Sequence, residues 1–314
     1  MNVGQTLTVQ ERLLTCLRAA LPTAVKTGWF LLRITIPVSF VVFLLKIAGI
    51  LRLVALVTGP LFARLGLPGE SALVFVTAAL LNVYSAIAVI QTLGLTGRVA
   101  TILALMCLIS HNLPVETAIQ KRTGSNALAI LFVRLLASVA GALALNLLLP
   151  PEAAVATTAS VPAASAALLG EFKGWLGGMA ILCLKIMTLI VLLMILEKIL
   201  DEFGVTRLIS RALKYPLMAL GIPAEAAFLW VIANTLGLAY GAGIMIDHVD
   251  GERLTRQQAD ILNYHIAISH SLLEDTLLFV AIGVSVWWIV LPRLALAGVA
   301  VWVKRGFQRW RTAG

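Results

Sequence analysis

The sequence predicts an all-α, polytopic membrane protein made of two inverted repeats, each with about three transmembrane helices and a re-entrant helical hairpin. Of its 314 residues, 60% are hydrophobic and only 12% are charged, and the mean hydropathy is +0.98. The core of a water-soluble domain of this length has no room for so many apolar side chains. Spans in hydrocarbon must satisfy their own backbone hydrogen bonds, so they are expected to be helical.

Six apolar runs are each long enough to cross a bilayer, which takes roughly 20 helical residues. They are residues 28–48, 71–93, 126–150, 176–200, 224–246 and 284–303. Residues 1–27 hold Glu11, Arg12 and Arg18 among apolar residues and lack the cleavage site of a signal peptide. We therefore expect residues 1–27 to form a separate amphipathic helix in the membrane plane.

The net charge of +9 indicates membrane orientation and gives no reason to expect nucleic acid as a partner. With the N-terminus inside and six crossings, fourteen Lys and Arg residues fall in cytoplasmic segments and five fall outside. This is the positive-inside bias. The expected location is a bacterial inner membrane with both termini cytoplasmic and residues 306–314 as a basic tail.

The chain contains an internal sequence repeat. Residues 65–70, "LGLPGE", match residues 220–225, "LGIPAE", and residues 95–117 align with 254–276 at 10 identities in 23 positions. The predicted repeats are residues 28–150 and 176–305, joined by a Pro/Ala/Ser/Thr-rich linker over 151–175.

An odd number of crossings in each half makes the repeat inverted, as in many secondary transporters. The competing count adds a full span at 97–112 and another at its twin, which would make the repeats parallel. That count moves Lys198, Arg207, Arg211 and Lys214 outside, against the charge bias.

Nearly the same sequence motif, here called the polar phrase, occurs at residues 109–117, "ISHNLPVET", and at 268–276, "ISHSLLEDT". The preceding stretch, 97–111, reaches roughly 22 Å as a helix, less than the hydrocarbon core. Helix-start signals follow at once, with Pro114 in a first turn and a capping box from Ser271 to Glu274. We therefore expect each phrase to be the tip of a re-entrant hairpin inside the membrane.

Ionisable groups at this depth mark a functional site by default, because they cost several kcal/mol unless paired or wetted. Each half supplies a histidine, a carboxylate, small polar residues and an arginine. The candidate substrate-binding residues are Ser110, His111, Asn112, Glu116, Arg134, Ser269, His270, Ser271, Glu274, Asp275, Arg293, Asn82 and Asn234. The structural alternative is internal pairing, with Arg134 neutralising Glu116 and Arg293 neutralising Asp275.

A second polar cluster occurs only in the second half. It comprises Asp260, Asn263, Tyr264 and His265, and it is either a substrate contact or a solvated hairpin wall. Glycines in residues 234–243 indicate close helix packing, or unwinding beside a ligand.

The two halves, with "LGLPGE" and "LGIPAE" entering a span and the tips "SHNLPVET" and "SHSLLEDT", resemble the Gate, or nucleoside-recognition, membrane domain. The likeness covers nearly all of residues 28–305. That domain also occurs in concentrative nucleoside transporters, bacterial ferrous-iron transporters and spore maturation proteins. The resemblance implies a transport-related membrane protein with two Gate units. The chain lacks the GTP-binding P-loop of the iron transporters and the full span count of a nucleoside carrier.

Three functions remain open. The first is a secondary transporter of a small polar or anionic, nucleoside-like solute. The second is a divalent metal permease, with the ligand set His111, Glu116, His270, Glu274 and Asp275. The third is a structural or accessory membrane protein. An enzyme is not expected, because no H-E-x-x-H or similar motif occurs, and no cofactor is expected. The expected partners are the lipid bilayer, a small-molecule or ion substrate and, in a homo-oligomer, further copies of the chain.

Overall fold

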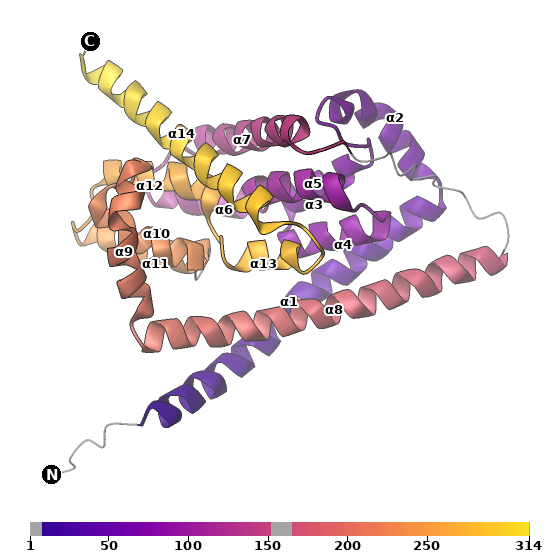
Figure 1. Cartoon of the computed structure of the whole chain (residues 1–314), viewed down its shortest axis with the longest axis horizontal. Coiled ribbons are helices and arrows are strands. Elements are labelled where there is room, and N and C mark those ends of the chain that lie inside the picture. The colour runs from indigo at the N-terminus through magenta and orange to yellow at the C-terminus, as the bar shows by residue number, and fades with distance from the viewer. Residues whose placement is uncertain (1–7, 152–164, 236, 314) are drawn as a thin grey trace.

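The computed structural model describes residues 8–151, 165–235 and 237–313, which contain helices and no strand (Figure 1). The first half contains α1 (Val9–Ile47), α2 (Ile50–Ala63), α3 (Ser71–Leu80), α4 (Val83–Leu93), α5 (Gly97–Ser110), α6 (Leu113–Arg122) and α7 (Ala127–Leu148). The second half contains α8 (Ser165–Glu202), α9 (Val205–Ala219), η1 (Ala224–Ala226), α10 (Ala227–Thr235), α11 (Leu238–Asp250), α12 (Arg256–Ser269), α13 (Glu274–Val280) and α14 (Val286–Ala313).

Five helical segments are long and apolar enough to cross a membrane, counting α5 and α6 together as one. The all-α polytopic membrane fold is therefore confirmed. The two halves also follow the same order of helices, so that α1 corresponds to α8, the α3–α4 pair to α10–α11, and the α5–α6 pair to α12–α13.

The equivalent helices α1 and α8 run antiparallel along most of their length (Figure 1). Arg12 Nε lies 2.8 Å from Glu202 Oε1 near one end of the pair, and Lys46 Nζ lies 3.0 Å from Glu171 Oε2 near the other. Equivalent helices that point in opposite directions make the two halves inverted relative to each other.

The prediction of a separate in-plane helix over residues 1–27 is wrong for residues 9–27, which form the first half of α1. Cys16, Ala20, Ala24 and Gly28 are buried at four-residue spacing, so one small-residue stripe continues into the apolar run. A Cβ added at Gly28 would lie 2.3 Å from Met187 Sδ in α8, which shows how closely the two helices approach.

Two other predicted boundaries also fall inside helices. The predicted linker over 151–175 overlaps α8, which begins at Ser165, and residues 152–164 lie outside the described part of the chain. The predicted tail at 306–314 continues α14 as far as Ala313.

The re-entrant hairpins are formed by α3–α4 and α10–α11, whose sequences predict full spans. In the first half, Gly66 precedes α3 and Arg98 follows α4. Arg98 Nη1 donates to Gly66 O at 3.4 Å, so the chain leaves the α3–α4 hairpin on the same side as it entered. In the second half, Gln258 Nε2 donates to Glu225 Oε2 at 3.0 Å across the same kind of return.

The segment 97–122 crosses as a broken helix, so the prediction that its polar phrase is a hairpin tip is wrong. α7 runs antiparallel to it, with Arg98 bonded to Asn146 O at 2.6 Å and Ser138 bonded to Met106 O at 3.4 Å. A hairpin would instead carry residue 122 back toward Arg98 and leave Asn146 out of its reach. The counterpart of this segment in the second half is α12–α13, which is not among the five apolar segments. Counted as a crossing by the repeat, it gives each half three crossings.

Candidate functional site

Each broken helix is interrupted at a histidine. α5 ends at Ser110 and α12 at Ser269, and the next residues, His111 and His270, have extended backbone. Asn112 (φ 49°) and Ser271 (φ 52°) then adopt the left-handed conformation, which lets the chain start a new helix.

The two hairpins support these breaks. Asn112 N donates to Ala78 O of α3 at 2.8 Å, and Ser271 N donates to Ala233 O of α10 at 3.0 Å. Main-chain groups that a continuous helix would satisfy internally therefore find partners at the hairpin tips. The hairpins thus hold both histidines at the centre of the bundle.

Two fully buried arginines cap the interrupted helices. Arg134 donates from Nε to Ile109 O at 2.8 Å and from Nη2 to His111 O at 2.6 Å. Arg293 repeats the pattern, donating from Nε to Ile268 O at 3.1 Å and from Nη2 to His270 O. A cation at a helix C-terminus offsets the negative end of the helix dipole. Two of the three nitrogens in each guanidinium are therefore occupied by backbone.

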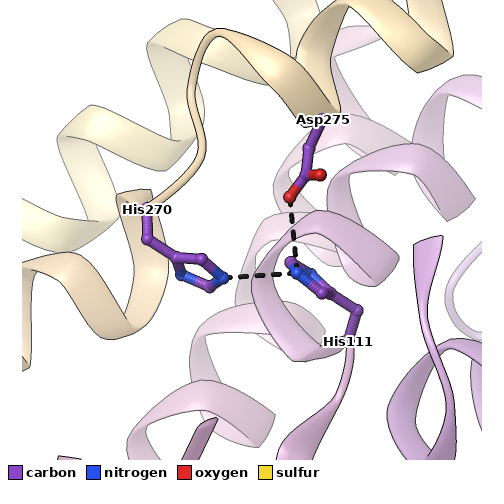
Figure 2. A group of neighbouring side chains, drawn as sticks. All are labelled: His111, His270 and Asp275. Carbon is purple, nitrogen blue, oxygen red and sulfur yellow. Dashed lines mark hydrogen bonds and ion pairs between the residues drawn. The ribbon is translucent and has the colours of Figure 1, made fainter. Parts of the chain in front are cut away.

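Between these caps, four buried side chains converge, and Figure 2 shows three of them. His270 Nε2 lies 3.3 Å from His111 Nε2, which lies 3.3 Å from Asp275 Oδ2. Glu116 reaches both rings, with Oε1 3.1 Å from His111 Nε2 and Oε2 3.0 Å from His270 Nε2. All four residues are at most 6% exposed.

The other ring nitrogens orient both histidines. His111 Nδ1 lies 3.2 Å from Cys107 O and His270 Nδ1 lies 2.7 Å from Ile266 O. A carbonyl oxygen only accepts, so each Nδ1 is assigned a proton; Nε2 then carries a lone pair in the neutral ring and donates to a carboxylate in the imidazolium. Metal-binding histidines commonly donate their second nitrogen to a carbonyl in this way.

With both rings neutral, the cluster brings together two Nε2 lone pairs and two carboxylates. Tetrahedral Zn²⁺ with bonds of roughly 2.0–2.1 Å has ligand atoms about 3.3 Å apart. Three of the contacts meet at His111 Nε2 at 3.1–3.3 Å, Glu116 reaches the two rings with different oxygens, and the donor atoms of His111, His270 and Asp275 all lie within 4.8 Å of one another. The set fits a divalent transition-metal ion that accepts nitrogen and oxygen ligands.

The two halves use their carboxylates differently. Glu116 Oε2 lies 2.7 Å from Arg134 Nη1, as the structural alternative predicts. Asp275 instead faces His111, and Nη1 of Arg293 has no hydrogen-bond partner among the described residues. Internal pairing therefore accounts for one half and leaves the other open.

Several predicted substrate-binding residues have local structural roles. Asn82 caps α4 by accepting from Ser85 N at 2.8 Å, and Asn234 donates to Trp230 O at 2.9 Å. Ser110 donates to Arg134 O at 3.2 Å. Glu274 lies outside the central group, where it accepts from Tyr84 at 2.6 Å.

Tyr84 and His265 are partners that the sequence did not single out for these roles. Tyr84 follows Asn82 at the first hairpin tip by two residues and donates to Glu274 Oε1. His265 Nδ1 lies 2.8 Å from Ser269 Oγ and accepts from Trp230 Nε1 at 3.0 Å. The sequence offers two weak signals for these roles. One is a tyrosine close to Asn82, and the other is a histidine and a serine one helical turn apart.

A comparison with known proteins places the chain among membrane proteins. It is 30% identical over 302 residues to the uncharacterized membrane protein YvoD of Bacillus subtilis (strain 168), covering 93% of this chain and 95% of YvoD. The chain belongs to the YvoD family. No family model matches the sequence, and no solved structure matches it. Membership in the YvoD family agrees with the membrane-spanning helices and leaves the cargo to be inferred from the site.

Proposed function

We propose that this YvoD-family protein is a membrane transporter of a divalent transition-metal ion, bound by His111, His270, Asp275 and Glu116. One observation carries the proposal: the Nε2 atoms of two histidines and two carboxylates lie 3.0–3.3 Å apart in four contacts, and His111, His270 and Asp275 could together hold a metal ion. With both rings neutral, four acceptors so close together repel unless a cation, either a metal ion or a proton, lies between them.

The local charge permits a cation. Two arginines and the N-termini of α6 and α13, at roughly +0.5 each, contribute about +3, while Glu116, Asp275 and two helix C-termini of roughly −0.5 each contribute about −3. With neutral histidines the cluster is therefore close to neutral. The charge of the arginines is compensated by the carboxylates and by the helix ends that the arginines cap.

The position of the site favours transport over a static structural role. Both histidines lie at breaks in crossing helices, and both breaks rest on re-entrant hairpins. Broken helices around a central polar site are typical of secondary transporters. A nucleoside-sized solute is disfavoured, because side chains only 3.0–3.3 Å apart leave no room for one between them.

A proton relay is the second candidate, and the same histidine pair favours it. One proton between the two Nε2 atoms would relieve their repulsion as a metal does, and would suit a proton-coupled carrier of a small solute. Measuring metal binding distinguishes the two candidates, because only the metal transporter requires a bound ion.

The orientation proposed is an inner-membrane protein with cytoplasmic termini. Relative to the topology predicted from the sequence, the observed positions of the hairpins and crossings move Arg98 outside and Arg253 and Arg256 inside. The count of basic residues changes from fourteen inside and five outside to fifteen inside and four outside. The positive-inside bias therefore becomes stronger.

The test is metal analysis of the detergent-purified protein, followed by uptake into proteoliposomes. We expect one Zn²⁺ or Co²⁺ per chain, a tetrahedral Co²⁺ absorption spectrum, and ion-dependent uptake. If the protein binds neither ion but takes up protons under a pH gradient, the metal-transporter proposal is wrong and the proton relay is supported.

A further inference from the structure

A line of polar side chains connects the central cluster with one end of the bundle. Gln120 of α6 donates to Asn263 O of α12 at 3.3 Å, and Asn263 Nδ2 donates to Thr123 Oγ1 at 2.8 Å and to Ser125 Oγ at 3.0 Å. Ser125 in turn donates to Asp260 at 2.6 Å. These residues follow the α6–α12 contact away from the histidines.

The same positions in the other half are apolar. The polar set is Gln120, Thr123, Ser125, Asp260, Asn263, Tyr264, His265 and Lys304. At the repeat offset of 159, its counterparts are Phe279, Ile282, Val284, Thr101, Ala104, Leu105, Met106 and Leu145. Only Thr101 carries a polar side chain, and it bonds to Gly97 O of its own helix at 2.8 Å. The apolar counterparts pack within one hydrophobic cluster, where Phe279 and Ala104 are fully buried.

The polar line also contains unsatisfied atoms. Gln120 Oε1, Asn263 Oδ1 and His265 Nε2 are buried and have no hydrogen-bond partner in the described chain. Because Trp230 donates to His265 Nδ1, the ring proton lies on Nε2, which is then a donor without an acceptor. Buried polar atoms normally have a protein or water partner, so the polar line favours water or a hydrated ion.

An ion pair stands at the outer end of this line. Lys304 Nζ lies 2.8 Å from Asp260 Oδ2, with side chains 20% and 15% exposed, and it also lies 4.3 Å from the ring centroid of Tyr264. This end is the one where α12 begins and where the described termini lie (Figure 1). A cation entering here meets a carboxylate whose partner, a lysine on a flexible stem, can swing away.

We infer that the central site exchanges its ion with the terminus-bearing side of the membrane along the α6–α12–α14 polar line, while the symmetry-related approach through α5 and α13 is closed by an apolar seal. The route is independent of the cargo, but its use by a divalent metal rests on the proposed function. The residues along the route admit a small hydrated cation or protons in single file.

Cysteine accessibility tests the route without requiring metal binding. In a background with Cys16, Cys107 and Cys183 changed to Ser, cysteines are placed at two route positions, Ser125→Cys and Asn263→Cys. The matched controls are their buried symmetry counterparts, Val284→Cys and Ala104→Cys. The probe is the permanently charged reagent (2-(trimethylammonium)ethyl) methanethiosulfonate, added to sealed vesicles of each orientation.

We expect both route cysteines to react from the terminus-bearing side and both controls to react about 100-fold more slowly, because a charge crosses an apolar layer poorly. Thr123→Cys provides a third route position if one variant fails to fold, as judged by gel filtration. Equal rates at Asn263→Cys and Ala104→Cys, or labelling of the route from the opposite side, would overturn the inference. A missing metal with asymmetric labelling would refute only the proposed cargo.

Discussion

His111 and His270 meet at 3.3 Å through their Nε2 atoms, although 159 positions separate them in the chain. Each ring is oriented by its own helix, because Nδ1 donates to the carbonyl four residues earlier. The rings are therefore held in place before any ligand arrives, and pre-organised ligands lose little entropy on binding a metal.

Replacing either histidine should abolish tight metal binding. His111→Ala or His270→Ala removes one of four ligands, and we expect Co²⁺ affinity to fall by about 100-fold or more, since even loss of a residue that merely supports a ligand costs 10–100-fold. The control is His248→Ala, because His248 lies in α11 and bonds to Ile244 O at 2.9 Å. Isothermal titration of the three variants measures the difference, and an unchanged affinity in His270→Ala would contradict the assignment.

Acid should release the metal, because protons compete for the Nε2 lone pairs. We expect the apparent Co²⁺ affinity of the wild-type protein to fall steadily as the pH is lowered below neutrality. Absorption titrations at a series of pH values measure this change. Binding that is independent of pH would indicate ligands other than these histidines.

Arg134 should be more important for stability than an ordinary buried polar residue. Arg134→Gln leaves Glu116 buried without its 2.7 Å partner, and breaking a buried ion pair costs about 3–5 kcal/mol. Thermal unfolding in detergent should therefore shift to markedly lower temperature. The double variant Arg134→Gln/Glu116→Gln should recover part of the loss, whereas no recovery would mean that the carbonyl caps alone account for it.

Ser271 offers a stabilising substitution. A non-glycine residue at φ 52° carries a backbone cost of about 1–3 kcal/mol, so Ser271→Gly should raise the unfolding temperature. Asn112→Gly should raise it less, because asparagine tolerates the left-handed region better than serine does. A lower unfolding temperature for Ser271→Gly would show that its hydroxyl contributes more than the strain costs.

Gly59 and Gly69 should respond in opposite ways to alanine. A Cβ at Gly69 would lie 2.4 Å from Ala55 O, a backbone atom that has no flexible end to move. Overpacking of this kind costs about 1–3 kcal/mol, so Gly69→Ala should lower the unfolding temperature. Gly59→Ala meets no atom within 4 Å and should raise it slightly, because alanine favours the helix by up to about 1 kcal/mol.

Composition and internal repetition predicted the fold class because both are properties of the whole chain. The hairpin was misplaced because length alone decided between a crossing and a return. Residues 71–93 are continuously apolar and long enough to span, yet they turn back at Leu81, where φ is −116° and ψ is −96°. No glycine or proline marks that turn in the first half, so its signal in the sequence is weak.

The central residues could be found from the sequence because ionisable groups are rare in apolar runs. The pairing of Arg134 with Glu116 could also be predicted, but the histidine partners could not, because Glu116 bonds to histidines of both halves and Asp275 to the histidine of the other half. Such exchange depends on the meeting of two inverted units in space. The one-sided group of Asp260, Asn263, Tyr264 and His265 gains its meaning from Gln120 of the other half, which bonds to Asn263.

The contrast between Gln120 and Phe279 has a consequence for how asymmetry is encoded. In an assembly of two identical half-length subunits, any polar side chain on one approach to the site would also be present on the other, because one codon would specify both. When the two halves are fused in one chain, each can carry different residues, so the two approaches can differ. Exchanging Gln120 and Phe279 alone should therefore weaken the preferred direction of access, whereas exchanging all eight pairs of positions should reverse it.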